Sequence, residues 1–94
     1  MKNIIKTPYT GMSKDKLLVC RLNGNRKARI MRYLRRGNLG IVGDCEVCDP
    51  FTKKVLTRTS EQFVKDGFEW WTLDIYMFEK YDVELTEEFL SKFA

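Results

Sequence analysis

Residues 26–36 constrain the fold most, because their apolar and basic side chains separate at the period of a helix. At about 100° per residue, the apolar side chains share an arc of about 160°, and the arginines occupy the opposite side. The apolar members are Ile30, Met31, Tyr33 and Leu34. At the period of two expected for a strand, charged and apolar residues would be mixed on both faces. The segment therefore predicts an amphipathic helix with one apolar and one basic face.

The residues at both ends suit such a helix. Asn25 can cap the first turn, and Gly37 can adopt the left-handed conformation that commonly follows a last turn. Arg35 and Arg36 would stand at the negative end of the helix dipole, which favours cations.

The same region leaves one alternative open. The Asn-Gly sequence within residues 23–25 lies between apolar runs and is also typical of a hairpin turn. In this alternative, residues 26–34 pair back on residues 16–22, and the chain forms a small β-barrel of the SH3-like kind with a C-terminal helix.

Four segments have the alternation or the β-branched content of strands. Residues 39–48 alternate around Gly43, and an Asp-Pro loop would return the chain as a hairpin. The densest apolar stretch, residues 68–78, predicts a central strand. We expect an antiparallel sheet built from residues 16–22, 39–48, 54–59 and 68–78.

The remaining segments are short. Residues 1–15 have no sustained period, and we expect an irregular or frayed N-terminal arm there. Thr59 followed by Gln62 is a capping pattern for a helical turn that must end at Gly67. A similar pattern at Thr86 predicts a short C-terminal helix.

A chain of 94 residues has room for one core only. Since strand and helix signals are mixed and no repeat or linker is visible, the sequence predicts a single small α+β domain over residues 1–94. A core of this size gives modest stability, so a homodimer is one form that such a chain could take.

The net charge of +4 conceals a strong asymmetry along the chain. Residues 1–36 contain eleven basic residues and one acidic residue, whereas residues 67–94 contain two basic and seven acidic residues. Such an asymmetry is typical of a face that binds phosphates, or of complementary ends that attract each other within a fold or across a dimer.

The basic face of the helix is the main candidate site. Arginine presents a planar fork that matches phosphate, and a row of cations releases counterions when it meets a nucleic acid. We therefore predict a small accessory protein, without enzyme activity, that binds DNA or RNA through its phosphates. The candidate nucleic-acid-binding residues are Arg26, Lys27, Arg29, Arg32, Arg35 and Arg36.

The basic face is also compatible with a second function, which is binding to another protein. The same arginines could meet an acidic protein surface, which would make the chain a modulator or inhibitor of a larger nucleic-acid-processing protein. If residues 68–78 form a strand, Trp70, Tyr76 and Phe78 share one face and could stack on bases, although burial in the core is the commoner role of large aromatics.

The cysteines give only a weak signal for metal. Cys45 and Cys48 have the C-x-x-C spacing, but the chain has no histidine and only Cys20 as a further cysteine. Zinc requires four ligands, so a site would need nearby carboxylates or a second chain. We predict no metal and no cofactor. The odd number of cysteines agrees with a reducing compartment.

Other motifs point away from catalysis. Gly37, Gly40 and Gly43 are evenly spaced, but they match neither a P-loop nor a dinucleotide fingerprint, and no helix follows them as in the G-x-x-G module that clamps RNA. Without histidine the commonest general base is missing, and we expect no enzyme. No apolar stretch is long enough for a membrane span and none resembles a signal peptide, so we expect a cytoplasmic protein that does not associate with membranes.

Overall fold

The computed structural model, which describes residues 1–94, confirms the amphipathic helix. Helix α1 spans Gly24–Leu34, and three residues of its apolar stripe, Ile30, Met31 and Leu34, are buried. The arginines lie on the outward side of the helix or at its margins. The interpretation of this segment as a strand of a β-barrel is therefore wrong, and the sheet stays open.

The two ends of α1 differ from the expectation. Asn23 rather than Asn25 is the cap, because its side chain accepts a hydrogen bond of 2.8 Å from the Arg26 N–H. Gly37 does not take the left-handed conformation. It is needed for close packing, since a Cβ at this position would stand 2.6 Å from a ring carbon of Trp70.

The main sheet has four strands in the order β1-β6-β5-β2. Strand β1 runs parallel to β6, and the other pairs are antiparallel, so the sheet is mixed rather than purely antiparallel. A separate small ladder joins β3 to β4. The strands are β1 (Lys2–Asn3), β2 (Asn38–Gly43), β3 (Val47–Cys48), β4 (Val55–Thr57), β5 (Ser60–Lys65) and β6 (Phe68–Trp71).

The helical turn expected after Thr59 is wrong, because this segment forms strand β5. Asp66 and Gly67 both have positive φ, 52° and 84°, and connect β5 to β6 as a two-residue hairpin. Asp-Gly is a favoured sequence for such a turn. The pattern at Thr59 and Gln62 matches a capping box only by coincidence of spacing.

The long central strand expected over residues 68–78 is also wrong beyond Trp71. The chain turns there into helix α2 (Thr72–Tyr81). The Asp74 carboxylate, in the first turn of α2, accepts a hydrogen bond of 2.9 Å from the Trp71 N–H, which stabilises the start of the helix.

The two remaining strand predictions fail in part. Residues 16–22 are extended only in part, with a single isolated bridge between Val19 and Val83, and their first residue is the last of a 3₁₀ turn, η1 (Lys14–Lys16). Residues 39–48 and 54–59 do not form one hairpin. Strand β2 pairs with β5 instead, which leaves only the short β3 and β4 to pair with each other.

The N-terminal arm is irregular, as expected, but it is not frayed. Ile4 is fully buried, Ile5 bridges to Leu85, and the Tyr9 side chain is 6% exposed. The C-terminal helix is confirmed as α3 (Glu87–Leu90), followed by a 3₁₀ turn, η2 (Ser91–Phe93). Thr86 caps α3 by accepting a hydrogen bond from the Phe89 N–H.

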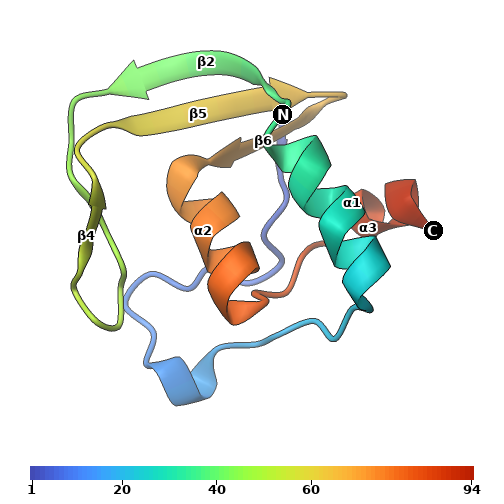
Figure 1. Ribbon diagram of the computed structural model, residues 1–94, viewed down its shortest axis with the longest axis horizontal. Coiled ribbons are helices and arrows are strands. Elements are labelled where there is room, and N and C mark those ends of the chain that lie inside the picture. The colour runs from blue at the N-terminus through green and yellow to red at the C-terminus, as the bar shows by residue number, and fades with distance from the viewer.

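The elements form an α+β domain with two layers. Figure 1 shows α1 and α2 on the same side of the sheet, with α3 beside α1 at the C-terminal end. Trp70 of β6, Phe78 of α2 and Phe89 of α3 are fully buried between these layers. None of the helices is both long enough and apolar enough to cross a membrane.

Candidate functional site

The basic residues of α1 and of the turn that follows it separate into two groups in the structure. The first group has partners within the chain. Arg26 donates from Nη2 to the Leu90 carbonyl oxygen at 2.9 Å, and its Nε atom is buried without a hydrogen-bond partner. Lys27 forms an ion pair of 2.7 Å with Asp82 and donates to the Glu79 carbonyl oxygen.

Arg35 also belongs to this group, because it forms an ion pair with Glu79 of α2. Both members of that pair are more than half exposed, so the pair is easily exchanged for other partners. Lys27 and Arg35 thus turn toward the end of α2, where Asp82, the C-cap residue, and Glu79 neutralise this side of the basic helix.

The second group, Arg29, Arg32 and Arg36, is exposed and forms no ion pair within the chain. Together with side chains from β5 and η2, these arginines line a hollow of about 330 Å³. We call this surface the basic hollow. Its lining residues are Arg29, Arg32, Tyr33, Arg36, Lys65, Lys92 and Phe93.

Tyr33 forms the floor of the basic hollow. Its hydroxyl donates a hydrogen bond of 2.6 Å to Asp66, and burial together with this carboxylate raises the pKa of the phenol. The Nζ atoms of Lys65 and Lys92 lie 4.9 and 5.6 Å from the ring centroid. Lysines so placed interact with the ring by cation–π attraction.

Asp66 does not line the basic hollow, but its carboxylate contacts two residues that do, Tyr33 and Lys92. The hydrogen bond from Tyr33 lowers the pKa of Asp66, and Lys92, at 3.5 Å, acts in the same direction. Asp66 neutralises at most one of the five cations, so the basic hollow retains an excess of positive charge.

Sequence reasoning missed Lys65 and Lys92. Lys65 immediately precedes the Asp-Gly turn, and Lys92 lies in the C-terminal segment, so neither is near α1 in the sequence. Recognition of the hairpin at Asp66 and Gly67 would have put Lys65 at the end of a strand, but only the packing of the elements brings both lysines to Tyr33.

The aromatics suggested for base stacking are engaged elsewhere. Trp70 and Phe78 are fully buried, and neither ring face is open. The Tyr76 and Tyr81 hydroxyls donate hydrogen bonds of 2.6 and 2.5 Å to Asp49. Tyr76 is therefore part of a buried network that fastens the loop after β3 to α2.

The cysteines and glycines take structural positions. Cys45 is exposed and Cys48 is half-buried, and no group of three or more potential metal ligands is present. Cys20 donates instead to backbone carbonyl oxygens of residues 82 and 83. A Cβ at Gly40 would stand 2.7 Å from the Gln62 side chain, so this glycine permits close packing between β2 and β5.

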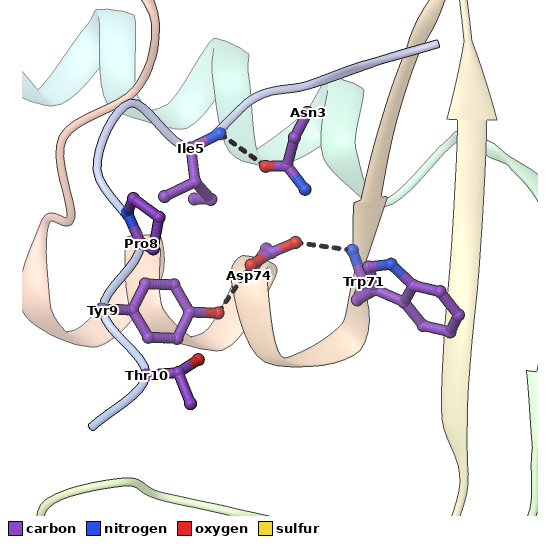
Figure 2. Close-up of a pocket in the computed structure, with 7 residues that line it drawn as sticks. All are labelled: Asn3, Ile5, Pro8, Tyr9, Thr10, Trp71 and Asp74. Atoms are coloured by element: carbon purple, nitrogen blue, oxygen red, sulfur yellow. Dashed lines mark hydrogen bonds between the residues drawn. The ribbon is translucent and has the colours of Figure 1, made fainter. Parts of the chain in front are cut away.

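A second hollow, also of about 330 Å³, lies between the N-terminal arm and the start of α2 (Figure 2). Figure 2 shows the Asp74 carboxylate between Tyr9 and Trp71, with a hydrogen bond of 2.6 Å from the Tyr9 hydroxyl. Burial raises the pKa of Asp74, although the hydrogen bonds from Tyr9 and Trp71 oppose this shift. Both carboxylate oxygens already have donors, so Asp74 joins the arm to the helix.

Comparison with known proteins finds no matching family model, no similar curated protein and no similar solved structure.

Proposed function

We propose that this protein binds nucleic acid through its phosphates at the basic hollow. The observation that carries the proposal is the group of three exposed arginines on α1 and the turn after it, Arg29, Arg32 and Arg36, which form no ion pair within the chain. Lys65 and Lys92 add two further cations from other elements.

The spacing of the arginines supports a polyanionic ligand. Arg29 and Arg32 lie about one turn apart on α1, a rise of about 4.5 Å at about 1.5 Å per residue, and Arg36 follows in the turn after the helix. Arginine offers planar donors that match phosphate, and several cations in a row neutralise successive phosphates with release of counterions. A single carboxylate or phosphate would use only part of such a surface.

The surface also supports binding with little choice of sequence. Phosphate contacts position a nucleic acid but do not read its bases. The ring of Tyr33 already contacts Lys65, Lys92 and Phe93, so these side chains would have to move before a base could stack on it. We expect affinities for unrelated sequences to agree within about tenfold.

The test compares two triple variants by titration of labelled DNA and RNA. Arg29→Glu, Arg32→Glu and Arg36→Glu together reverse the charge of the basic hollow. The matched control, Lys16→Glu, Arg21→Glu and Arg58→Glu, reverses three exposed basic residues elsewhere that have no ion pair. We expect the first variant to lose at least about a hundredfold in affinity and the control less than about tenfold.

An equal loss of affinity in the two triple variants would contradict a localised site. Binding would then depend only on the net charge of the protein. A protein that binds neither DNA nor RNA at low salt would also contradict the proposal. In that case, a pull-down from nuclease-treated lysate tests the alternative partner. If the wild type and the control variant retain one stoichiometric protein and the arginine variant does not, the basic hollow binds an acidic protein surface instead of nucleic acid.

A further inference from the structure

Strand β2 is an outer edge of the main sheet, and its apolar side chains are uncovered. Leu39, Ile41 and Val42 are 57%, 62% and 54% exposed. An edge strand also presents backbone N–H and C=O groups without partners. As Figure 1 shows, β2 lies along the outer border of the sheet with no element beyond it. The strand therefore combines open hydrogen-bonding groups with an exposed apolar patch.

The opposite edge of the same sheet is strand β1, which is too short and too charged to pair readily with another chain. Strand β1 has only two residues, and Lys2 in it forms an ion pair of 2.8 Å with Glu88. Short, charged edges are the usual protection against pairing with another chain. One open edge and one closed edge favour a finite assembly of two copies over an extended polymer.

The charges around β2 are self-complementary. Residues 37–43 contain no charged side chain and no proline, and Arg36 and Asp44 border them at either end. Both bordering residues are exposed and neither forms an ion pair within the chain. Gly40 lies midway between them in the sequence.

We propose that β2 pairs antiparallel with β2 of a second copy of this chain, giving a homodimer with one continuous sheet. A two-fold axis near Gly40 brings Arg36 of each copy beside Asp44 of the other, so the same ion pair forms twice. Leu39 of each copy then lies opposite Ile41 of the other copy. A parallel arrangement would instead set like charges side by side.

A bulge in β2 limits the strength of this pairing. Gly40 and Ile41 both lie opposite Gln62 of β5, and the Gln62 side chain accepts a hydrogen bond of 3.3 Å from the Ile41 N–H. Bulges bend an edge strand and locally interrupt its ladder. Because a single strand edge also buries little area, we expect a dissociation constant in the range of about 1–100 µM.

The first experiment is sedimentation equilibrium on nuclease-treated protein, at concentrations up to about 500 µM. The average mass is expected to rise from 11.1 kDa toward twice that value. Ile41→Lys should raise the dissociation constant at least about tenfold. The matched control is Leu18→Lys, since Leu18 is 51% exposed but lies outside the sheet; it should leave the constant within about twofold.

The second experiment tests the two-fold arrangement by charge exchange. Asp44→Arg alone should weaken the dimer, and the double variant Arg36→Asp with Asp44→Arg should restore it to within about threefold of the wild type. Circular dichroism confirms that each variant is folded, which is expected because the substituted side chains are exposed.

A monomer at every concentration would overturn the proposal, as would an equal effect of Ile41→Lys and Leu18→Lys. Failure of the double variant to restore association would overturn the arrangement around Gly40. Arg36 also lines the basic hollow, but all these measurements are made without nucleic acid, so their outcome does not depend on whether the hollow binds nucleic acid.

Discussion

The indole Nε1 of Trp70 donates a hydrogen bond of 3.1 Å to the backbone carbonyl oxygen of Leu34, and so ties the end of the basic helix to the sheet. The last carbonyl groups of a helix have no partner within it. Trp70 therefore satisfies a buried acceptor while filling the space between α1 and β6. This contact, together with burial of Ile30, Met31 and Leu34, sets the direction in which the arginine-bearing face points.

We predict that Trp70→Phe lowers the free energy of unfolding by about 2–4 kcal/mol, because it leaves the Leu34 acceptor unsatisfied and opens a cavity. Urea unfolding followed by circular dichroism measures this loss. Trp71→Phe is the matched control. Trp71 is only half-buried, and its hydrogen bond to Asp74 comes from the backbone N–H, which Phe keeps, so the cost should stay below about 1 kcal/mol. Equal costs would show that the bond to Leu34 contributes nothing.

Gly37 should tolerate no side chain. A Cβ there would stand 2.6 Å from the Trp70 ring and 2.9 Å from the Phe63 Cβ, so Gly37→Ala should cost about 1–3 kcal/mol through overpacking. Gly24→Ala is the control, since nothing lies within 4 Å of a Cβ at the first residue of α1. It should be neutral or stabilise by up to about 1 kcal/mol. Thermal unfolding of both variants distinguishes packing from backbone flexibility as the reason for glycine at position 37.

Asp49 should contribute to stability at neutral pH and lose that contribution in acid. Burial alone would raise its pKa, but hydrogen bonds from Tyr76, Tyr81, Thr52 and Phe51 lower it below the ordinary value. A lowered pKa means that the unfolded chain binds the proton more readily, so stability falls as pH falls from about 4 toward the lower folded pKa. Asp49→Asn should be less stable than the wild type at pH 7, with a difference that narrows in acid. A difference that is constant with pH would contradict this role.

Asp74 should behave in the opposite way. Its burial raises the pKa above that of the unfolded chain, and nearby Glu69 adds to the shift. The folded protein therefore binds the proton more readily, and stability falls as pH rises through the interval between the ordinary pKa and the raised one. Relative to Asp74→Asn, the wild type should gain stability as pH falls through that interval. If the stability difference between wild type and variant changed with pH in the same direction for Asp49→Asn and Asp74→Asn, the opposite pKa shifts of the two carboxylates would be contradicted.

The parts of the fold that the sequence predicted are those with a complete local signal. The apolar stripe of α1 and the cap at Thr86 each lie within one helix, so periodicity and capping were sufficient. The turn at Asp66 and Gly67 also has a local signal, but the spacing of Thr59 and Gln62 predicts a helix start in the segment that forms β5.

The transition from β6 to α2 could not be found from periodicity. Apolar residues continue at a period of two from Trp71 through Met77, and the helix depends on the Asp74 side chain capping the Trp71 N–H and on burial of Met77 and Phe78 against other elements. The arrangement of the candidate site also could not be predicted from local sequence patterns. The arginines of α1 were predicted as a group, but which of them face α2 and which face Lys65 and Lys92 depends on packing between elements distant in the sequence.

The most direct test of the proposed phosphate-binding surface is the salt dependence of binding to duplex DNA. Each phosphate contact contributes about 0.9 to the slope of log Kobs against log salt. Neutralising the three free arginines, as Arg29→Ala, Arg32→Ala and Arg36→Ala, should reduce the slope by about 2–3, whereas Lys16→Ala, Arg21→Ala and Arg58→Ala should change it by less than about 0.5. An unchanged slope in the arginine variant, or an equal reduction in both, would contradict phosphate binding at the basic hollow.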